Sequence, residues 1–352
     1  MISSRFTTIV QRAVCAISQG PALAALPESL IGNPDEAGAH VASLLATALR
    51  RVRITDSMQY CYIPAGDWQT DATPAAYKPK DAVSFHILAG GCCWLDMAGR
   101  RTTLKEGDIA AFPFGTPHRI GAGDDGAEID PGGALPPSPW RETPILRYGG
   151  NDRIVRILCG YVRCEALSFA PFRNALPEFI HVKTAGGDDW LAGILSQIVA
   201  EVDAPRGGGS AVLERLTELA LLEVLRRQLH QEQPEAIGWL AAIRDPVVGR
   251  CLGLLHSDPA RHWTLDKLAK EVGASRSVIG ERFAARLGIT PIAYLRDWRL
   301  LLARERLTEE NVPIASLAID AGYASEAAFN RAFARANGCP PAAYRNQRRS
   351  ES

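Results

Sequence analysis

Eight cysteines are the side chains of this 352-residue sequence that are best able to bind a metal or to respond to an oxidant. No stretch approaches the roughly 20 apolar residues of a membrane span, and the N-terminus lacks the continuous apolar segment of a secretory signal. We therefore expect a cytoplasmic protein without a membrane partner. In that reducing compartment, cysteines serve as free thiols, metal ligands or redox switches more often than as disulfides. The eight are Cys15, Cys61, Cys92, Cys93, Cys159, Cys164, Cys251 and Cys339.

The charge is balanced over the whole chain but not along it. The 39 Lys and Arg match the 39 Asp and Glu in total, whereas Asp245 to Ser352 holds 16 basic and 12 acidic residues. A modestly basic end on an acidic front part is typical of a DNA-binding domain joined to a small-molecule domain. A chain of this length is expected to form two or three domains.

The basic end begins with a predicted pair of helices joined by a short turn. Thr264 is a good N-cap for the first helix, which Gly273 can end with a positive φ. Ser275 caps the second helix, which Gly288 closes. Two helices joined in this way predict a helix-turn-helix, whose second helix offers its first turns to a DNA major groove.

The same arrangement recurs about 50 residues later. A helix starting at Ile314 stops at Gly322, and Ser325 and Gly338 bound the helix that follows. Residues 291–307 predict a long helix that connects the two copies rigidly. Two copies with matching caps predict a double helix-turn-helix.

Four segments of the basic end have a characteristic pattern. They are Trp-Thr-Leu at 263–265, Gly-x-x-x-x-x-Tyr-Leu at 288–295, Ala-Gly-Tyr-Ala-Ser-Glu-Ala-Ala-Phe-Asn-Arg-Ala-Phe at 321–333 and Gly-Cys-Pro-Pro-Ala-Ala-Tyr-Arg at 338–345. With these segments, residues 239–349 resemble the AraC/XylS family of transcription regulators. The resemblance implies two recognition helices in successive major grooves of double-stranded promoter DNA, with RNA polymerase as a further partner.

By this resemblance, eight polar residues near the starts of the two recognition helices are candidates for base contact. Arginine suits guanine or phosphate, asparagine suits adenine, and glutamate can accept from cytosine N4. The alternative for each exposed charge is a solvated face or a salt bridge. Gly280 lies where a longer side chain would reach a base, so the first helix is expected to read fewer bases. The candidates are Arg276, Ser277, Glu281 and Arg282 in the first helix and Ser325, Glu326, Asn330 and Arg331 in the second.

The front part of the sequence predicts a β-sheet domain that resembles a metal-binding fold. Short apolar runs punctuated by Gly and Pro predict an antiparallel sandwich or barrel. Residues 85–95 and 104–118 resemble a cupin barrel, whose second motif ends in the Pro-x-Gly-x-Pro-His of residues 113–118. In cupin enzymes that histidine holds a catalytic metal together with a His-x-His and a Glu. Here the first motif offers only His86 and no carboxylate, which argues against an oxygenase or isomerase.

Cysteines are candidates for the missing ligands. The pattern of Cys61, His86, His118 and Cys159 is similar to AraC-type activators that respond to reactive chlorine and related oxidants. If the four side chains converge, they make the tetrahedral donor set that zinc prefers. Oxidation of Cys61, Cys93 or Cys159 would then be the signal. The alternatives are cysteines buried in an ordinary core and a small molecule as the signal.

We therefore predict an α+β multidomain chain in four parts. Residues 1–55 form a helical or partly disordered extension, 56–187 a cupin-like sensor barrel, 188–238 a helical linker, and 239–349 the all-α double helix-turn-helix. The linker helices either form a homodimer interface or pack on their own domain. The predicted function is a sequence-specific transcription regulator, not an enzyme, controlled by an oxidant or a small molecule at the Cys/His site.

Two other functions compete with this prediction. The first is a metal-dependent cupin enzyme with an appended DNA-binding domain, which would need a redox metal with open coordination positions. The second is Ada-type DNA repair, which would need closely spaced cysteines and an alkyl-accepting nucleophile motif. The sequence shows neither of these last two features.

Overall fold

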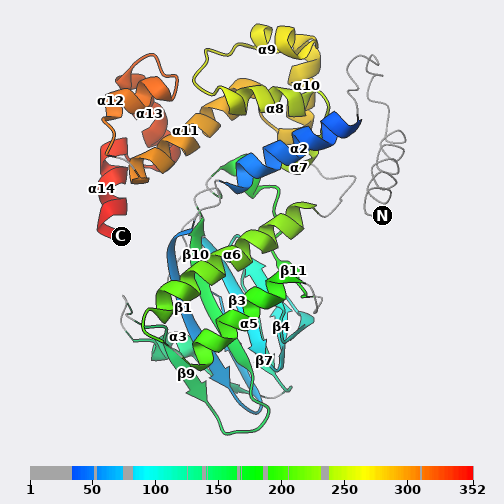
Figure 1. The fold of residues 1–352 in the computed structure, drawn as a ribbon, viewed down its shortest axis with the longest axis vertical. Helices are drawn as coiled ribbons and strands as arrows, with labels where there is room; N and C mark the ends of the chain where they lie inside the picture. The colour runs from blue at the N-terminus through cyan, green and yellow to red at the C-terminus, as the bar shows by residue number, and fades with distance from the viewer. Residues whose placement is uncertain are drawn as a thin grey trace. The chain divides into compact units, whose positions relative to one another are not determined.

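The computed structural model describes residues 34–50, 54–73, 82–124, 126–136, 140, 142–164, 167, 169–184, 189–204, 206–230, 238–309 and 311–351. The chain forms two compact units (Figure 1). The sheet unit comprises residues 51–168 and 176–231, and the helical unit comprises residues 1–50, 169–175 and 232–352. A sheet-rich front part and a helical C-terminal part confirm the predicted fold class.

The sheet unit contains a six-stranded sheet in the order β11-β6-β3-β10-β1-β9. Neighbouring strands run antiparallel except β1 and β9, which are parallel. The strands are β1 (Ile54–Pro64), β3 (Ala82–Gly90), β6 (Ile109–Phe112), β9 (Ile145–Tyr148), β10 (Arg156–Cys164) and β11 (Ile180–Val182).

A second sheet has five strands in the order β5-β4-β7-β2-β8. Alternate residues of both sheets meet in one apolar core that includes Tyr62, Trp68, Leu88, Leu95 and Phe112. We call this space the barrel interior. The strands are β2 (Trp68–Asp71), β4 (Cys92–Met97), β5 (Arg100–Lys105), β7 (Arg119–Ala122) and β8 (Ala127–Glu128), and a short helix α3 (Pro131–Ala134) follows β8.

Helices α5 (Trp190–Asp203) and α6 (Gly209–His230) belong to the sheet unit. In Figure 1 they lie across the six-stranded sheet, and Leu221 and Val224 of α6 face Val83 and Val162 of that sheet. Residues 188–230 therefore do not form a separate linker. The helices pack on their own domain, which leaves Val212 and Leu219 of α6 exposed, so a homodimer interface on these helices stays a prediction.

The helical unit carries the repeated helix pairs. Its C-terminal helices are α7 (Trp239–Arg244), α8 (Val248–Ser257), α9 (Leu265–Val272), α10 (Arg276–Leu287), α11 (Pro291–Glu309), α12 (Ile314–Asp320), α13 (Glu326–Asn337) and α14 (Pro341–Glu351). None of the helices in the described part of the chain has both the length and the apolar character needed to cross a membrane.

The caps of these helices are those predicted from the sequence. The hydroxyls of Ser275 and Ser325 accept the backbone N–H groups of Val278 and Ala328. Thr264 caps α9 by accepting from Lys267 N, and Gly273 ends it at φ 74°. Gly288 and Gly338 close α10 and α13 at φ 67° and 78°. Because a positive φ strains any residue with a Cβ, these glycines fix where each helix stops.

Two segments from the front half of the sequence complete the helical unit. Helix α4 (Ala170–Arg173) lies in a seven-residue stretch, 169–175, that leaves the sheet unit after β10 and returns to it before β11. The ring of Phe169 lies 5.2 Å from that of Tyr294 and 5.4 Å from that of Trp298. Phe172 contacts Trp239 edge-on, with ring centroids 5.9 Å apart. The predicted single domain over residues 56–187 is therefore interrupted.

Helix α2 (Pro34–Leu49), within the predicted N-terminal extension, is the second such segment. Leu44, Leu45 and Ala48 are buried, and His40 Nε2 lies 2.8 Å from the carbonyl oxygen of Gly249 on α8. A Cβ on Gly253 would lie 2.5 Å from the His40 ring, so this glycine is what allows the two helices to approach closely.

Candidate functional site

Three of the four predicted Cys/His ligands meet in the barrel interior. His86 Nδ1 lies 3.2 Å from Cys159 Sγ, and His86 Nε2 lies 2.7 Å from His118 Nε2. Cys159 and His86 are directly paired across β10 and β3, and His118 is reached from the turn after β6. The ring of Phe112 stacks on His118 at 3.7 Å and holds it in place.

The donor and acceptor roles within this cluster follow from its hydrogen bonds. His118 Nδ1 donates to the carbonyl of Thr116 at 2.7 Å, because a carbonyl can only accept. His118 Nε2 is then an acceptor, so His86 donates to it through Nε2 and accepts the Cys159 S–H through Nδ1. Tyr60 adds a hydrogen bond to Cys159. We call Tyr60, Cys159, His86 and His118 the relay.

Burial keeps the relay uncharged. His86, His118 and Cys159 are each less than 5 % exposed. Loss of hydration lowers the pKa of His118 to about 4, lowers the pKa of His86 well below its usual range, and raises the pKa of the Cys159 thiol well above its usual range. At neutral pH the relay is therefore two neutral imidazoles, a thiol and a phenol.

The predicted convergence of all four ligands is wrong, because Cys61 lies on the opposite face of the sheet. Cys61 pairs with Leu158, one residue before Cys159, and neighbouring residues of a strand point to opposite faces. Cys159 and His118 also approach different ring nitrogens of His86, which point in different directions. In the described residues no group of three or more His, Cys, Asp or Glu is arranged to hold a metal ion. A four-ligand zinc site does not fit this arrangement.

The adjacent thiols Cys92 and Cys93 point in opposite directions, as expected within a strand. Cys93 belongs to the core of the barrel interior, whereas Cys92 is exposed. Burial raises the pKa values of the Cys61 and Cys93 thiols to about 12. The three cysteines predicted to sense oxidants are therefore protonated and shielded, which makes them slow to react.

Among the buried polar atoms that have no hydrogen-bond partner within the described residues, three belong to the most deeply buried side chains of the barrel interior. They are Tyr62 Oη, Trp68 Nε1 and Thr70 Oγ1, on side chains at most 1 % exposed. Tyr62 and Trp68 touch edge-on at 5.3 Å, and Trp68 and Thr70 alternate on β2 and so share a face. A buried donor without an acceptor costs about 1–3 kcal/mol. These atoms mark a place where an acceptor oxygen would be stabilised.

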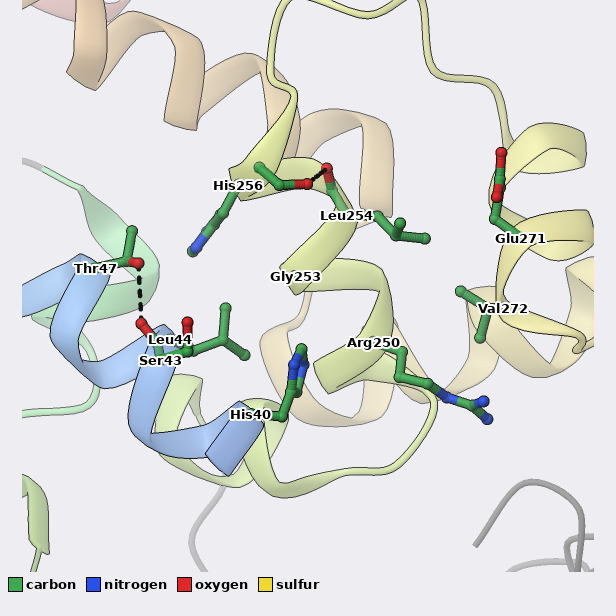
Figure 2. A pocket seen from close by; sticks show the side chains of 11 residues that line it. His40, Ser43, Leu44, Thr47, Arg250, Gly253, Leu254, His256, Glu271 and Val272 are labelled. Carbon is green, nitrogen blue, oxygen red and sulfur yellow. Dashed lines mark hydrogen bonds between the residues drawn. The ribbon is translucent and has the colours of Figure 1, made fainter. Parts of the chain in front are cut away.

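A separate pocket of about 450 Å³ lies in the helical unit between α2, α8 and α9 (Figure 2). His40 and Thr47 line it from α2, Arg250 and His256 from α8, and Glu271 from α9. None of the residues predicted from the sequence to form a site lines this pocket.

Most of the predicted DNA-contacting residues lie at the surface of α10 and α13. Arg276, Ser277 and Glu281 on α10 and Ser325, Glu326 and Arg331 at the start of α13 are exposed, and Asn330 is half-buried. In the part of the chain that the structure describes, Arg331 has no ion-pair partner. These positions leave the groove-facing turns of both helices accessible.

Arg282 is the exception, and its prediction as an exposed reading residue is wrong. Its side chain is 11 % exposed, and its Nη1 donates to Asp245 Oδ2 at 2.8 Å. Asp245 is itself 1 % exposed and also accepts the backbone N–H groups of Val247 and Val248. Arg282 thus joins α10 to the turn before α8 instead of facing solvent.

Together these observations define a class of protein: a cupin domain joined to a double helix-turn-helix, which is a DNA-binding transcription regulator. A family model described as Cupin matches residues 43–230, and a model described as a helix-turn-helix domain matches residues 268–347.

Known proteins resemble the chain over most of its length. An AraC-like transcription regulator of Streptomyces lividans is 33% identical over 272 residues, covering 75% of this chain and 86% of the relative. The Escherichia coli activator RclR, named as specific for RCS, is 25% identical and covers 80% of this chain and 89% of itself. The crystal structure of ToxT from Vibrio cholerae is 9% identical, with a TM-score of 0.34 over 82% of this chain and 96% of that one. The chain belongs to the AraC family of transcription regulators.

Proposed function

We propose that this regulator responds to a small uncharged molecule carrying an acceptor oxygen, bound in the barrel interior beside the relay. The observation that carries the proposal is the set of unpartnered polar atoms of Tyr62, Trp68 and Thr70. Each of these side chains can donate to a ligand oxygen, and the apolar core around them favours an uncharged molecule. Bound at promoter DNA, the regulator then acts on RNA polymerase.

The relay offers a physical means for such a ligand to change the fold. It links Tyr60 of β1, Cys159 of β10 and His86 of β3 to His118, which directly precedes β7 of the other sheet. A ligand that reorients one member must reorient the others, because each ring nitrogen of His86 is already engaged. The two sheets are thereby coupled by hydrogen bonds whose direction a ligand can change. No metal ion takes part in this proposed response.

An oxidant is the competing signal. RclR is named for such a response. Against it stand the burial and protonation of Cys61, Cys93 and Cys159 in this chain, each less than 5 % exposed. The relatives are named as regulators, which also favours this proposal over the metal-dependent enzyme.

Removing an unpartnered hydroxyl should stabilise the sheet unit and abolish the response. We expect Tyr62→Phe and Thr70→Val each to raise its free energy of unfolding by about 1 kcal/mol, since each deletes a buried polar atom without a partner. Thr217→Val is the matched control: this hydroxyl is fully buried and donates to Gln59 Oε1 at 2.8 Å, so its loss should destabilise. Calorimetry, together with hydrogen exchange of the strands, measures the expected gain of stability in the two variants and the expected loss in the control.

Thr70→Val, together with Cys61→Ala and Cys159→Ala, distinguishes a small-molecule signal from an oxidant. The intact regulator would be screened for a rise in melting temperature with a panel of uncharged aldehydes, ketones and alcohols, and separately treated with hypochlorous acid. We expect a panel member to stabilise the wild type and Cys61→Ala, but not Thr70→Val or Cys159→Ala. Loss of DNA binding after hypochlorous acid, cancelled by Cys61→Ala and with no panel member active, would instead assign the signal to an oxidant.

We also propose that a second copy docks on the outer face of α6. Val212 and Leu219 lie two turns apart on this helix and are 47% and 45% exposed. Trp190 is 47% exposed and lies beside Arg226, one further two-turn step along the same face. Sedimentation of wild type and Leu219→Glu tests this, and a monomeric wild type at micromolar concentration would contradict it.

A further inference from the structure

The two recognition helices can be compared residue by residue. Helices α10 and α13 each span 12 residues, and equivalent positions are 50 apart in the chain. The caps Ser275 and Gly288 of α10 correspond to Ser325 and Gly338 of α13. The buried faces also match, with Phe283 at the position of Phe333. Differences between the outward side chains are therefore differences in what each helix presents to DNA.

From the second turn onward, the exposed basic side chains belong to α13. In the first turn the comparison is reversed, because Arg276 of α10 corresponds to Glu326 of α13. Where α13 has Asn330, Arg331 and Arg335, the equivalent positions of α10 hold glycine, glutamate and alanine at 280, 281 and 285. A Cβ added to Gly280 would meet no atom within 4 Å, so the missing side chain leaves open space on that face. Beyond its first turn, α10 thus lacks the exposed reach and positive charge that α13 offers.

The arginines of α10 are also engaged within the protein. Arg282 is held by Asp245, and Arg276 Nη1 lies 3.1 Å from Asp266 Oδ1 in an exposed pair. By contrast, Arg331 and Arg335 are exposed and have no ion-pair partner within the described residues. Asn330 is half-buried, and its Oδ1 is a buried atom without a hydrogen-bond partner there. The exposed pair of Arg276 is weak enough to be exchanged for a phosphate.

We propose that α13 carries most of the base recognition, while α10 mainly anchors the protein on the DNA backbone. Arg331 then reads guanine in one half of the operator, and Asn330 reads adenine there once its half-buried amide turns toward the groove. Arg276 contacts a phosphate at the other half, and Glu281 opposes binding there through repulsion from the backbone. The operator should carry strong base preferences over one major groove and weak preferences over the next.

Selection of duplexes from a random library by the full-length regulator tests this directly. We expect one half-site to be strongly preferred, and Asn330→Ala or Arg331→Ala to lower affinity for the selected duplex about 10-fold or more while relaxing one base position each. Glu281→Ala should raise affinity for unrelated duplexes. Arg276→Ala should weaken binding to all sequences equally and lower the salt slope by about one.

A gain of recognition provides the complementary test. The double substitution Gly280→Asn and Glu281→Arg makes α10 resemble α13, and we expect it to add base preferences to the second half-site. Circular dichroism would confirm that each variant is folded. Equal base preference in both half-sites of the wild type would overturn the proposal. So would a loss of affinity in Glu281→Ala as large as that in Arg331→Ala, or selection of no sequence by the wild type.

Discussion

Replacing Asp245 with alanine is expected to destabilise the helical unit by about 3–5 kcal/mol. The substitution removes the acceptor for Arg282, whose side chain is only 11 % exposed, and leaves that positive charge without compensation. It also frees the N–H groups of Val247 and Val248 at the start of α8. Hydrogen exchange of α8 and α10 in intact protein measures the loss, with α5 and α6 as an internal reference.

A matched control exists within the same unit. Asp266 pairs with Arg276, but their side chains are 72% and 66% exposed, so Asp266→Ala should change stability by no more than about 1 kcal/mol. Equal changes in stability for Asp245→Ala and Asp266→Ala would show that the buried pair contributes no more to the fold than the exposed one.

Replacing Phe169 with alanine should lower the stability of the helical unit by about 3–5 kcal/mol, although this residue precedes the double helix-turn-helix by some 95 positions. Its ring is 3% exposed and packs edge-on against Tyr294 and Trp298 in α11. Loss of the ring leaves a cavity against two aromatic side chains. We expect amides of α11 to exchange faster and the intact protein to melt at a lower temperature.

Two control variants, Phe169→Leu and Phe179→Ala, test whether the loss of stability comes from the contact of Phe169 with α11. The leucine variant keeps most of the apolar volume and should lose clearly less stability than alanine. Phe179 stacks on Phe112 within the sheet unit, so its truncation should accelerate exchange there and leave α11 unchanged. Unchanged exchange of α11 in Phe169→Ala would show that the contact contributes little.

The helix pairs could be predicted closely because their signals are local. Thr264, Ser275 and Ser325 cap helices that begin at the next residue, and Gly273 and Gly288 end them. Each cap acts within four residues of the chain, so the sequence alone defines it. Helix α14 is harder to predict, because the two prolines at 340 and 341 suggest an ending while Pro341 in fact occupies the first turn of a new helix.

The errors concern contacts between distant residues. Arg282 has the spacing of an exposed position, but its partner Asp245 lies 37 residues away. Cys61 could be placed in a strand, yet its facing depends on its register with β10, and a shift of one residue reverses it. The unpartnered polar atoms of Tyr62, Trp68 and Thr70 carry no sequence signal, since only the packed interior reveals that they lack partners.

The helical unit is assembled from three separate stretches of chain, 1–50, 169–175 and 232–352. A fragment that starts at residue 232 therefore lacks Phe169, Phe172 and helix α2, and its exposed aromatic patch around Tyr294 and Trp298 would favour aggregation. During synthesis, the first two stretches leave the ribosome long before their partners exist. The DNA-binding end thus reaches its final core only when the last hundred residues arrive, after the strands of the sheet unit have had time to pair.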